Sequence, residues 1–410
     1  MYFFYNLGIR FYGLALWFAS FFNPKARLWV DGRKNWRQKL IKNKDKVNRC
    51  FWFHCASLGE FEQARPLMEA LRNRNPETPV LVTFFSPSGY EIKKRYPGAD
   101  YICYLPLDTP GNARFFVNVV RPKAVFFVKY EFWINILDEI AGGKIPLYNI
   151  AGNFRPSQRF FTRKNPFYSN VLRTFTHFFV QNEESLVLLN SIGLNNVSVC
   201  GDTRYDRVFQ NAQQITRNDV IADFVGGENV LILGSTWSIE HDFLIPLINE
   251  GHITEKVIIA PHEVDHKTLK SIENELQVPN FRYTHYEDYA MKSHKRVLII
   301  DCIGMLANTY SVGTYAFIGG AFGKGLHNIL EPAVFGLPVI FGPNHQKFPE
   351  AQEFIGHDIG FSVVDGQDFL IKRAHILENI AELKLASKKF MKSKIGATDL
   401  ILSQLDRDLN

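Results

Sequence analysis

Short apolar segments alternate with amphipathic segments along most of the chain, and this alternation restricts the fold more than any other feature of the sequence. The segment Ala124–Val128 is apolar at every position, whereas a strand with one exposed face would alternate apolar and polar residues. Strands that are apolar on both faces are typical of parallel sheets with helices on each side. We therefore predict an α/β protein built on parallel sheets.

The alternation forms two series, and a chain of 410 residues exceeds the usual size of one hydrophobic core. The predicted strands are Phe51–Ala56, Val80–Phe85, Tyr101–Tyr104, Ala124–Val128, Pro146–Ile150 and Phe175–Gln181 in the first series, and Val230–Leu233, Val257–Ala260, Phe281–Tyr283, Val297–Ile300, Tyr315–Ile318, Pro338–Phe341 and Gly360–Val364 in the second. Helices are predicted between them, for example over Glu131–Ile140. We predict an N-terminal Rossmann-like domain over residues 25–212, a polar linker over residues 213–227 and a C-terminal Rossmann-like domain over residues 228–410 that ends in helices. Two doubly wound domains of this kind are expected to face a central cleft with the carboxyl ends of their strands.

Residues 2–22 form an apolar and aromatic run that is about as long as a membrane span. Arg10 interrupts the run, and a mid-membrane arginine is costly, so the sequence leaves open whether the segment spans the bilayer or lies in its interface. Basic residues are frequent from Lys25 to Arg49, which favours contact with anionic lipid headgroups on the cytoplasmic side. We assign residues 1–24 to a membrane-associated segment; the alternative is a hydrophobic helix packed in the first domain.

The net charge indicates the kind of partner, and the cysteines indicate the redox compartment. A formal net charge of +6 suits an anionic partner, which is a phosphorylated substrate, an acidic membrane surface or a nucleic acid. Nucleic acid is the least favoured, because the sequence has no zinc-finger spacing, recognition-helix pattern or RNA-binding aromatic motif. The cysteines are scattered and odd in number, which predicts free thiols in a reducing compartment and no structural zinc.

The stretch Gly319–Pro343 is predicted to pass from a strand through a glycine-rich loop into a helix that begins at His327-Asn328. A glycine loop followed by a helix start can present backbone N–H groups to an anion. Glu331 falls one turn into this helix, where its carboxylate can accept both hydroxyls of a ribose. The alternative is that the glycines only shape a turn and that Asn328 and Glu331 form a capping box. These residues alone leave both interpretations open.

A second candidate site follows the first predicted strand, in the sequence His54 to Glu60. Glu60 falls in the first turn of the next helix, where a carboxylate can accept the proton of an attacking hydroxyl. Ser57 with Glu60 three residues later is also a capping box, and the sequence alone favours the cap.

Further hydroxyls and one imidazole follow other predicted strands: Ser86, Ser88, Ser235, Thr236 and His262. Each can contact a phosphate or a substrate, and each can equally cap the next helix or lie on the surface. No Ser-His-Asp order, P-loop or metalloprotease spacing is present. A metal site built on His262, Glu263 and His266 is the less favoured interpretation, and no metal or other cofactor is expected.

Taken in order, several segments give the chain a specific resemblance to the 3-deoxy-D-manno-octulosonic acid (Kdo) transferases. The resemblance runs from the N-terminus to near residue 360, and its most specific segments are His54–Glu60, Leu105–Asp108 with Pro110-Gly111, Glu131–Trp133, Gln181–Glu184, Gly201–Asp206 and Gly319–Pro332.

The resemblance implies a GT-B fold, a membrane-associated N-terminus and an inverting, metal-independent transfer of Kdo from CMP-Kdo to the lipid A precursor, lipid IVA. It implies that Glu60 is the general base. The donor-binding residues that it implies are Ser235, Thr236, His262, Gly319, Gly320, Gly325, His327, Asn328 and Glu331, and the acceptor-side candidates are Ser57, Gly59, Ser86, Ser88 and Glu131. The expected location is the cytoplasmic face of the inner membrane, and the expected partners are CMP-Kdo, the lipid A precursor and an anionic membrane surface, with no nucleic acid.

The chain departs from the family pattern in two segments. Where many relatives read Glu-Thr-Glu-Leu-Trp-Pro-Asn, this sequence reads Lys129 to Asn135 as Lys-Tyr-Glu-Phe-Trp-Ile-Asn, and His262 stands where relatives often have arginine. A neutral imidazole holds phosphate more weakly than a guanidinium does. Two alternatives therefore stay open, a GT-B transferase that uses a UDP-sugar, such as a lipid A disaccharide synthase, and a membrane-bound nucleotide-sugar-binding protein without catalysis.

Overall fold

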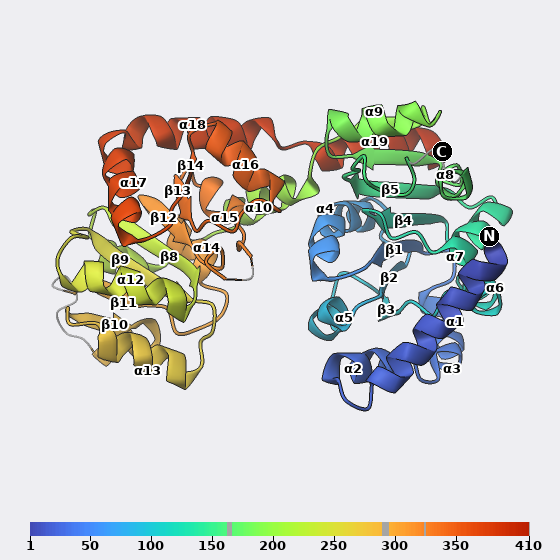
Figure 1. Ribbon diagram of the computed structural model, residues 1–410, viewed down its shortest axis with the longest axis horizontal. Helices are drawn as coiled ribbons and strands as arrows, with labels where there is room; N and C mark the ends of the chain where they lie inside the picture. Colours follow the sequence, from blue (N-terminus) through green and yellow to red (C-terminus); the bar gives the residue numbers. More distant parts are fainter. Residues whose placement is uncertain (162–165, 289–294, 324, 410) are drawn as a thin grey trace. The chain divides into compact units, whose positions relative to one another are not determined.

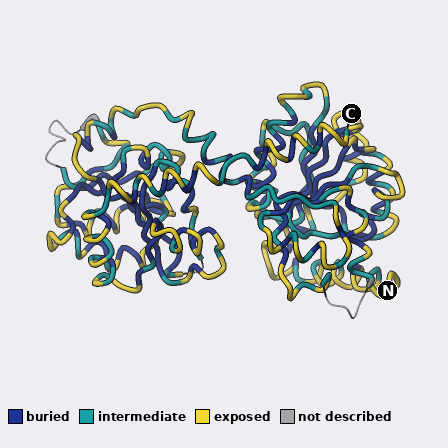
Figure 2. Tube along the Cα trace, turned by 90° about the horizontal axis from the view of Figure 1, so that it is seen from above, coloured by how far each residue is buried: buried dark blue, intermediate teal, exposed yellow. Residues whose placement is uncertain are grey.

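The computed structural model describes residues 1–161, 166–288, 295–323 and 325–409, and the chain divides into two compact units (Figure 1). Unit 1 comprises Met1–Arg207 and Gly396–Asn410, and unit 2 comprises Val208–Ile395. Each unit has its own buried sheet, and Figure 2 shows that the buried positions concentrate inside each unit. Two α/β units with parallel sheets confirm the predicted fold class at this level.

The sheet of unit 1 is parallel throughout, in the order β3-β2-β1-β4-β5-β6-β7. Its strands are β1 (Phe51–Cys55), β2 (Val80–Phe84), β3 (Tyr101–Tyr104), β4 (Ala124–Val128), β5 (Leu147–Gly152), β6 (His177–Val180) and β7 (Val197–Val199). Its helices are α1 (Tyr2–Ala19), α2 (Pro24–Gly32), α3 (Trp36–Lys42), η1 (Lys44–Lys46), α4 (Leu58–Arg74), α5 (Pro87–Lys93), α6 (Pro110–Val120), α7 (Ile134–Gly142), α8 (Pro166–Leu172), α9 (Glu183–Ser191) and α19 (Ala397–Leu409); α10 (Thr203–Gln213) contains the boundary between the units.

The sheet of unit 2 is parallel as well, in the order β10-β11-β9-β8-β12-β13-β14. Its strands are β8 (Val230–Thr236), β9 (Lys256–Pro261), β10 (Asn280–Arg282), β11 (Val297–Ile299), β12 (Tyr315–Ile318), β13 (Val339–Phe341) and β14 (Gly360–Ser362). Its helices are α11 (Asp219–Val225), α12 (Ser238–Asn249), α13 (His266–Glu275), η2 (Tyr283–Asp288), α14 (Leu306–Tyr310), α15 (Leu330–Ala333), α16 (Pro349–Gly356), α17 (Gly366–Glu378) and α18 (Ile380–Ser393).

Strand order places a switch point in each sheet. In unit 1 the order runs outward from β1 toward β3 on one side and from β4 toward β7 on the other, so the crossover lies between β1 and β4. In unit 2 the corresponding crossover lies between β8 and β12. Ligands of open α/β sheets bind beyond the carboxyl ends of the strands at such points. The segments that follow β1, β4, β8 and β12 are therefore where a site is expected.

Alternating side chains of the unit 1 strands fill two cores, one on each face of the sheet. Phe51 and Phe53 pack with residues of α4, whereas Trp52 packs with residues of α6 and α7. Both faces are covered, which is why β4 is apolar at every position and β1 at every position except His54.

The C-terminal tail differs from the prediction that residues 228–410 form one domain. Ile401, Leu402 and Leu405 of α19 pack into the same core as α4, and Asp206 accepts hydrogen bonds from the start of the helix, so Gly396–Asn410 belongs to unit 1. The predicted linker over residues 213–227 also differs, because it contains α11, whose buried side chains place it in unit 2.

Two predicted helices are shorter than expected. The helix predicted over Glu131–Ile140 begins at Ile134, because the Asp108 carboxylate accepts the N–H groups of Asn135 and Ile136 and so fixes the first turn there. The helix predicted from His327 is confined to the single turn of α15 (Leu330–Ala333), because Asn328 accepts from Leu330 N–H and Pro332 follows within that turn. β7 and α9 were not predicted from the sequence.

The apolar N-terminal run forms α1, which is docked on unit 1 through a few buried contacts. Ile9 is buried, and an added Cβ at Gly13 would meet the side chain of Leu107. Most large side chains of α1 are exposed, including Phe3 and Phe4 at 71 % each. Within the part of the chain that the structure describes, no helix is long and apolar enough to cross a membrane.

Candidate active site

Glu60 lies beside the switch point of unit 1, in the first turn of α4 directly after β1. The hydroxyl of Ser57 donates a short hydrogen bond to Glu60 Oε2, and Ser57 makes no side-chain bond to the backbone of the helix. The expected capping box is therefore not formed, because the serine hydroxyl is used by the carboxylate itself. The Glu60 side chain keeps 17 % of its surface exposed, so the carboxylate remains accessible to a substrate hydroxyl.

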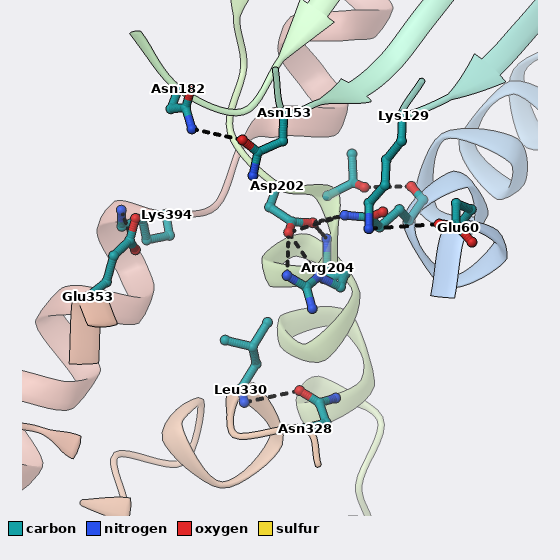
Figure 3. A network of polar contacts seen from close by, with 12 residues as sticks. Glu60, Lys129, Asn153, Asn182, Asp202, Arg204, Asn328, Leu330, Glu353 and Lys394 are labelled. Carbon is teal, nitrogen blue, oxygen red and sulfur yellow. Dashed lines mark hydrogen bonds and ion pairs between the residues drawn. The ribbon is translucent and has the colours of Figure 1, made fainter. Parts of the chain in front are cut away.

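Lys129 follows β4 on the other side of the switch point, and its side chain is directed toward Glu60 (Figure 3). Lys129 Nζ lies 3.9 Å from Glu60 Oε1. The lysine has a left-handed backbone with φ of 59°, held by its N–H bonded to the Ile150 carbonyl at 2.9 Å and by Asn149 Nδ2, which donates to its carbonyl. Such backbone strain persists only where surrounding contacts hold it, and it is common at functional sites.

Glu131 adds a second carboxyl group to this edge. Burial raises the pKa of Glu131 to about 7, and the nearby Glu60 carboxylate adds to the rise. Near neutral pH, Glu131 is therefore divided between its protonated and ionised forms. The structure brings Glu60, Lys129 and Glu131 together, and of these the sequence proposed roles only for the two acids.

A buried histidine supports the segment that carries Glu131. Trp133 Nε1 donates to His54 Nε2 at 3.2 Å, and His54 Nδ1 lies 3.0 Å from Thr83 Oγ1. Burial lowers the pKa of His54 to about 3, so the imidazole is neutral and accepts from the indole. Trp133 also stacks on Phe85 at 4.6 Å between ring centroids. The only sign of this role in the sequence is the place of His54 within an otherwise apolar strand.

The other acceptor-side candidates occupy the neighbouring strand ends. Ser86 caps α5, with its Oγ accepting from Ser88 N–H at 3.3 Å, and the two hydroxyls lie 3.0 Å apart. Gly59 is exposed in the first turn of α4, and the nearest atom to an added Cβ is Ser57 Oγ at 3.9 Å. These residues follow β1 and β2 and so line the same sheet edge as Glu60.

An ion pair extends the polar network along α4. Gln63, one turn after Glu60, donates from Nε2 to both carboxylate oxygens of Asp202 at 3.3 Å. Arg204 Nε donates to Asp202 at 2.8 Å (Figure 3). Burial raises the pKa of Asp202, but pairing with Arg204 outweighs burial and leaves the pKa below its usual range.

In unit 2, a buried glutamate joins the two strand ends at the switch point. Glu240 Oε2 accepts from Trp237 N–H at 2.7 Å, directly after β8, and Glu240 Oε1 accepts from Gly320 N–H at 2.8 Å, directly after β12. Thr236 Oγ1 bonds to His241 Nε2 at 2.8 Å, and Ser235 has a left-handed φ of 53°. Glu240 thus caps the start of α12 by accepting from Trp237 N–H, a contact that the sequence did not indicate.

The glycines after β12 allow close packing of the two strand ends. A Cβ at Gly319 would lie 2.4 Å from the Ser235 carbonyl oxygen, and Gly320 has φ of 95°. Their amides donate within the protein, Gly319 to the Gly234 carbonyl at 2.9 Å and Gly320 to Glu240. Gly325 N–H bonds to the Gly320 carbonyl and His327 N–H to the Gly319 carbonyl, at 3.1 and 3.2 Å. In this conformation these four amides are already bonded, contrary to the expectation that they face an anion.

Asn328 and Glu331 lie at the start of α15. Asn328 Oδ1 accepts from Leu330 N–H at 3.1 Å (Figure 3). Asn328 Nδ2 donates to Glu331 Oε1 at 3.0 Å. Glu331 also lines a cavity of about 220 Å³ between α10, α14 and α15, with apolar walls that include Ala307 and Phe335. A carboxylate in an apolar hollow suits a ribose under a nucleobase.

Three rings form a stack beside this segment. The Trp237 and His262 centroids are 4.3 Å apart, and those of His262 and His327 are 4.4 Å apart. Trp237 Nε1 donates to His327 Nε2 at 3.0 Å. Burial, and to a smaller degree the nearby His262, lowers the pKa of His327 to about 4, so this imidazole is neutral at physiological pH. The stack brings His262 and His327 together as the sequence expected, and it adds Trp237.

Comparison with solved structures defines the class of fold. The UDP-GlcNAc 2-epimerase from Neisseria meningitidis, solved with bound UDP-GlcNAc, is 15% identical, with 87% of this chain and 99% of that chain covered at a TM-score of 0.61. An identity this low supports the fold alone. The two parallel-sheet α/β units are of the kind found in GT-B glycosyltransferases.

Sequence comparison defines the family. Residues 34–207 match the family model for 3-deoxy-D-manno-octulosonic-acid transferase. A Kdo transferase of Aquifex aeolicus is 27% identical over 84% of this chain and 92% of its own length, and one of Rickettsia prowazekii is 25% identical over 93% and 84%. The chain is a glycosyltransferase whose residues 34–207 match the Kdo transferase domain, and the resemblance found in its sequence is confirmed. Among the described residues, no group of three or more His, Cys, Asp or Glu side chains is placed to hold a metal ion.

Proposed function

We propose that this glycosyltransferase moves Kdo from CMP-Kdo to the lipid A precursor, lipid IVA, with inversion at the anomeric carbon. The observation that carries the proposal is the Glu60 carboxylate, which stands accessible at the switch point of the Kdo transferase domain between Ser57 and Lys129. The curated relatives that match most of the chain are named 3-deoxy-D-manno-octulosonic acid transferases.

In the proposed reaction, a hydroxyl oxygen of the acceptor forms a bond to the anomeric carbon of Kdo. The bond from that carbon to the CMP phosphate oxygen breaks on the opposite face, and its electron pair leaves with CMP. Glu60 takes the proton of the attacking hydroxyl. The Ser57 hydroxyl orients the carboxylate through Oε2, so that Oε1 is the oxygen that accepts the proton. Glu131, with a pKa of about 7, is suited to hold a proton on the same edge.

On the donor side, we assign the ribose and base of CMP to the hollow beside Glu331, and the phosphate to the imidazole of His262. We no longer assign the phosphate to backbone amides, because those of Gly319, Gly320, Gly325 and His327 are already bonded within the protein. The glycines shape the turn, and side chains are proposed to bind the phosphate instead. The end of β8 has an irregular register between Gly234 and Thr236, and we propose that Ser235 and Thr236 position these side chains there. Asn328 does so at the start of α15, through its bond to Leu330 N–H.

For the lipid acceptor, we propose that α1 lies in the membrane interface at the cytoplasmic face of the inner membrane. Its exposed face carries Phe3, Phe4, Phe11 and Phe18, of which Phe18 is 64 % exposed. The following segment, Lys25–Arg49, is rich in lysine and arginine. An aromatic face next to a basic segment is the pattern of a helix that binds an anionic membrane surface.

A single-residue substitution tests the base. Glu60→Gln keeps the shape of the side chain but cannot take a proton, so transfer should fall by about a hundredfold to ten-thousandfold, the range that general bases contribute. The assay incubates CMP-Kdo, lipid IVA and protein, and measures product mass. Glu62→Gln is the matched control, since Glu62 lies on the same helix and pairs with Lys93 at 2.8 Å.

Two results would separate the elements of the proposal. Near-normal turnover in Glu60→Gln would contradict the assignment of the base. A folded wild-type protein that makes no Kdo-lipid would contradict the reaction. Thermal shift with CMP and with UDP tests the donor independently: stabilisation by UDP and not by CMP would favour a transferase that uses a UDP-sugar.

A further inference from the structure

The inner side of α1 is joined by hydrogen bonds to the start of α7. Tyr5 OH donates to Asp108 Oδ2 at 2.6 Å and accepts from Ile134 N–H at 3.3 Å. The next residue, Asn6, accepts through Oδ1 from Asn135 Nδ2 at 2.9 Å. Two consecutive residues of the apolar N-terminal helix thus contact the first two residues of α7.

Asp108 is the common partner of both helices. Besides the Tyr5 hydroxyl, it accepts Asn135 N–H on Oδ2 and Ile136 N–H on Oδ1, each at 3.0 Å. Burial raises the pKa of Tyr5 well above its usual range, so the phenol keeps its proton and acts as the donor. Asp108 therefore connects Tyr5 of α1 to the first turn of α7 through its two carboxylate oxygens.

The first turn of α7 is continuous with the catalytic edge. Trp133 directly precedes α7 and is held by His54, and Glu131 lies two residues earlier. Lys129, which contacts Glu60, begins this segment. The stretch from Lys129 to Asn135 is therefore fixed at one end by the sheet and at the other by α1.

The opposite side of α1 presents aromatic rings to the surroundings. Phe4, next to Tyr5, is 71 % exposed, and Phe11 is 62 % exposed. One helix thus combines a surface suited to lipid with an inner face bonded to the catalytic segment.

We propose that Tyr5 and Asn6 are positioning residues for the transfer reaction, which hold the Lys129–Asn135 segment in place when α1 is seated on an anionic lipid surface. This inference rests on the proposed function, since it assumes that Glu60 and the adjacent segment serve the reaction. It extends that function by assigning to α1 a role in catalysis in addition to attachment.

Hydrogen–deuterium exchange tests the coupling without reference to activity. The full chain is measured with and without vesicles of mixed phosphatidylcholine and phosphatidylglycerol. In the wild type, vesicles should slow exchange both in α1 and in the amides of residues 134–136. In Tyr5→Phe with Asn6→Ala, the aromatic face is unchanged, so vesicles should still bind and protect α1, whereas their effect on residues 134–136 should be lost. Tyr2→Phe is the matched control, because Tyr2 OH reaches Asp138 of α7 at 3.3 Å from an exposed position; it should behave as the wild type does.

The activity readout separates positioning from binding. Turnover of Kdo transfer on vesicles should fall about tenfold in the double variant, within the range expected when a reacting group is misplaced, with an unchanged thermal shift by CMP. The inference is overturned if vesicles protect α1 alone in the wild type, if residues 134–136 respond equally in the double variant, or if the wild type does not bind vesicles. If the exchange results appear as expected but the wild type makes no Kdo-lipid, the coupling stands and the proposed function fails.

Discussion

At the scale of single residues, backbone strain marks the two switch points. Lys129, directly after β4, has φ of 59°, and Ser235, within the end of β8, has φ of 53°. A left-handed conformation costs a non-glycine residue about 1–2 kcal/mol. In both places the strained residue directs the chain around the sheet edge where a ligand site is expected. Lys144 has a similar φ of 52° but is exposed and lies before β5, away from the carboxyl ends of the strands.

The two lysines provide a matched test of strain against function. Glycine adopts positive φ freely but is more flexible when unfolded, so Lys144→Gly should raise the free energy of unfolding by about 0.5–1 kcal/mol. Lys129→Gly should be at least as stable as the wild type and yet lose transfer activity, because the amine beside Glu60 is gone. Urea unfolding and the product assay measure the two effects. Full activity in Lys129→Gly would show that the lysine serves only the backbone.

At the scale of elements, α19 shows how a helix at the end of the chain joins the first unit. Its side chains Ile401, Leu402 and Leu405 are buried in the core beside α4. Its start is held by Asp206, which accepts Gly396 N–H at 2.6 Å, Thr398 N–H at 2.7 Å and Thr398 Oγ1 at 2.6 Å. One buried carboxylate thus satisfies several donors at the start of the helix.

Removing this carboxylate should destabilise the packing of α19 more than the rest of unit 1. Asp206→Asn presents an amide that cannot accept all of these donors, so unfolding should become easier by about 1–3 kcal/mol. Limited proteolysis should cut faster within residues 396–410 than elsewhere in unit 1. Asp399→Asn, in the exposed part of the same first turn, is the control and should change stability by no more than about 0.5 kcal/mol. An unchanged cleavage pattern in Asp206→Asn would contradict the anchoring role.

At the scale of the whole molecule, both units bury neutral histidines. Burial lowers the pKa of His54 in unit 1 to about 3 and the pKa of His241 in unit 2 to about 4. Burial and the nearby His262 lower the pKa of His327 to about 4. Each ring accepts or shares a hydrogen bond that requires at least one unprotonated nitrogen. Protonation of these histidines at low pH should therefore destabilise both units.

The sign of the pH dependence follows from these shifts. An unfolded histidine has a pKa near 6.5, so below that pH the unfolded chain binds protons that the folded histidines do not. The contribution of these histidines to the free energy of unfolding should therefore be complete above pH 6.5. It should decrease as the pH drops toward about 4, by at most about 1.4 kcal/mol per pH unit for each fully buried ring. The partly exposed His327 should contribute less. Urea unfolding across this window checks the slope, and His241→Gln should reduce it; an equal slope in that variant would exclude His241 as a contributor.

The sequence by itself determined the elements, because the period and polarity of a strand or helix are local properties. The strand predictions at Tyr101–Tyr104, Ala124–Val128 and Tyr315–Ile318 match the structure residue for residue. The order of strands and helices then placed Glu60 and Gly319 at the carboxyl ends of strands, since every strand of a parallel sheet ends at the same edge. The family resemblance was equally accessible, because it rests on short local motifs.

Only the tertiary structure decided which groups meet, because those contacts join residues far apart in the sequence. Ser57 and Glu60 had the spacing of a capping box, but the structure directs the hydroxyl to the carboxylate and brings Lys129 to its other oxygen. The glycine amides had the spacing of an anion site, but Glu240 and the strand-end carbonyls accept them first. A buried donor is stable only when it has a partner, and that partner is fixed by packing, which local periodicity does not encode.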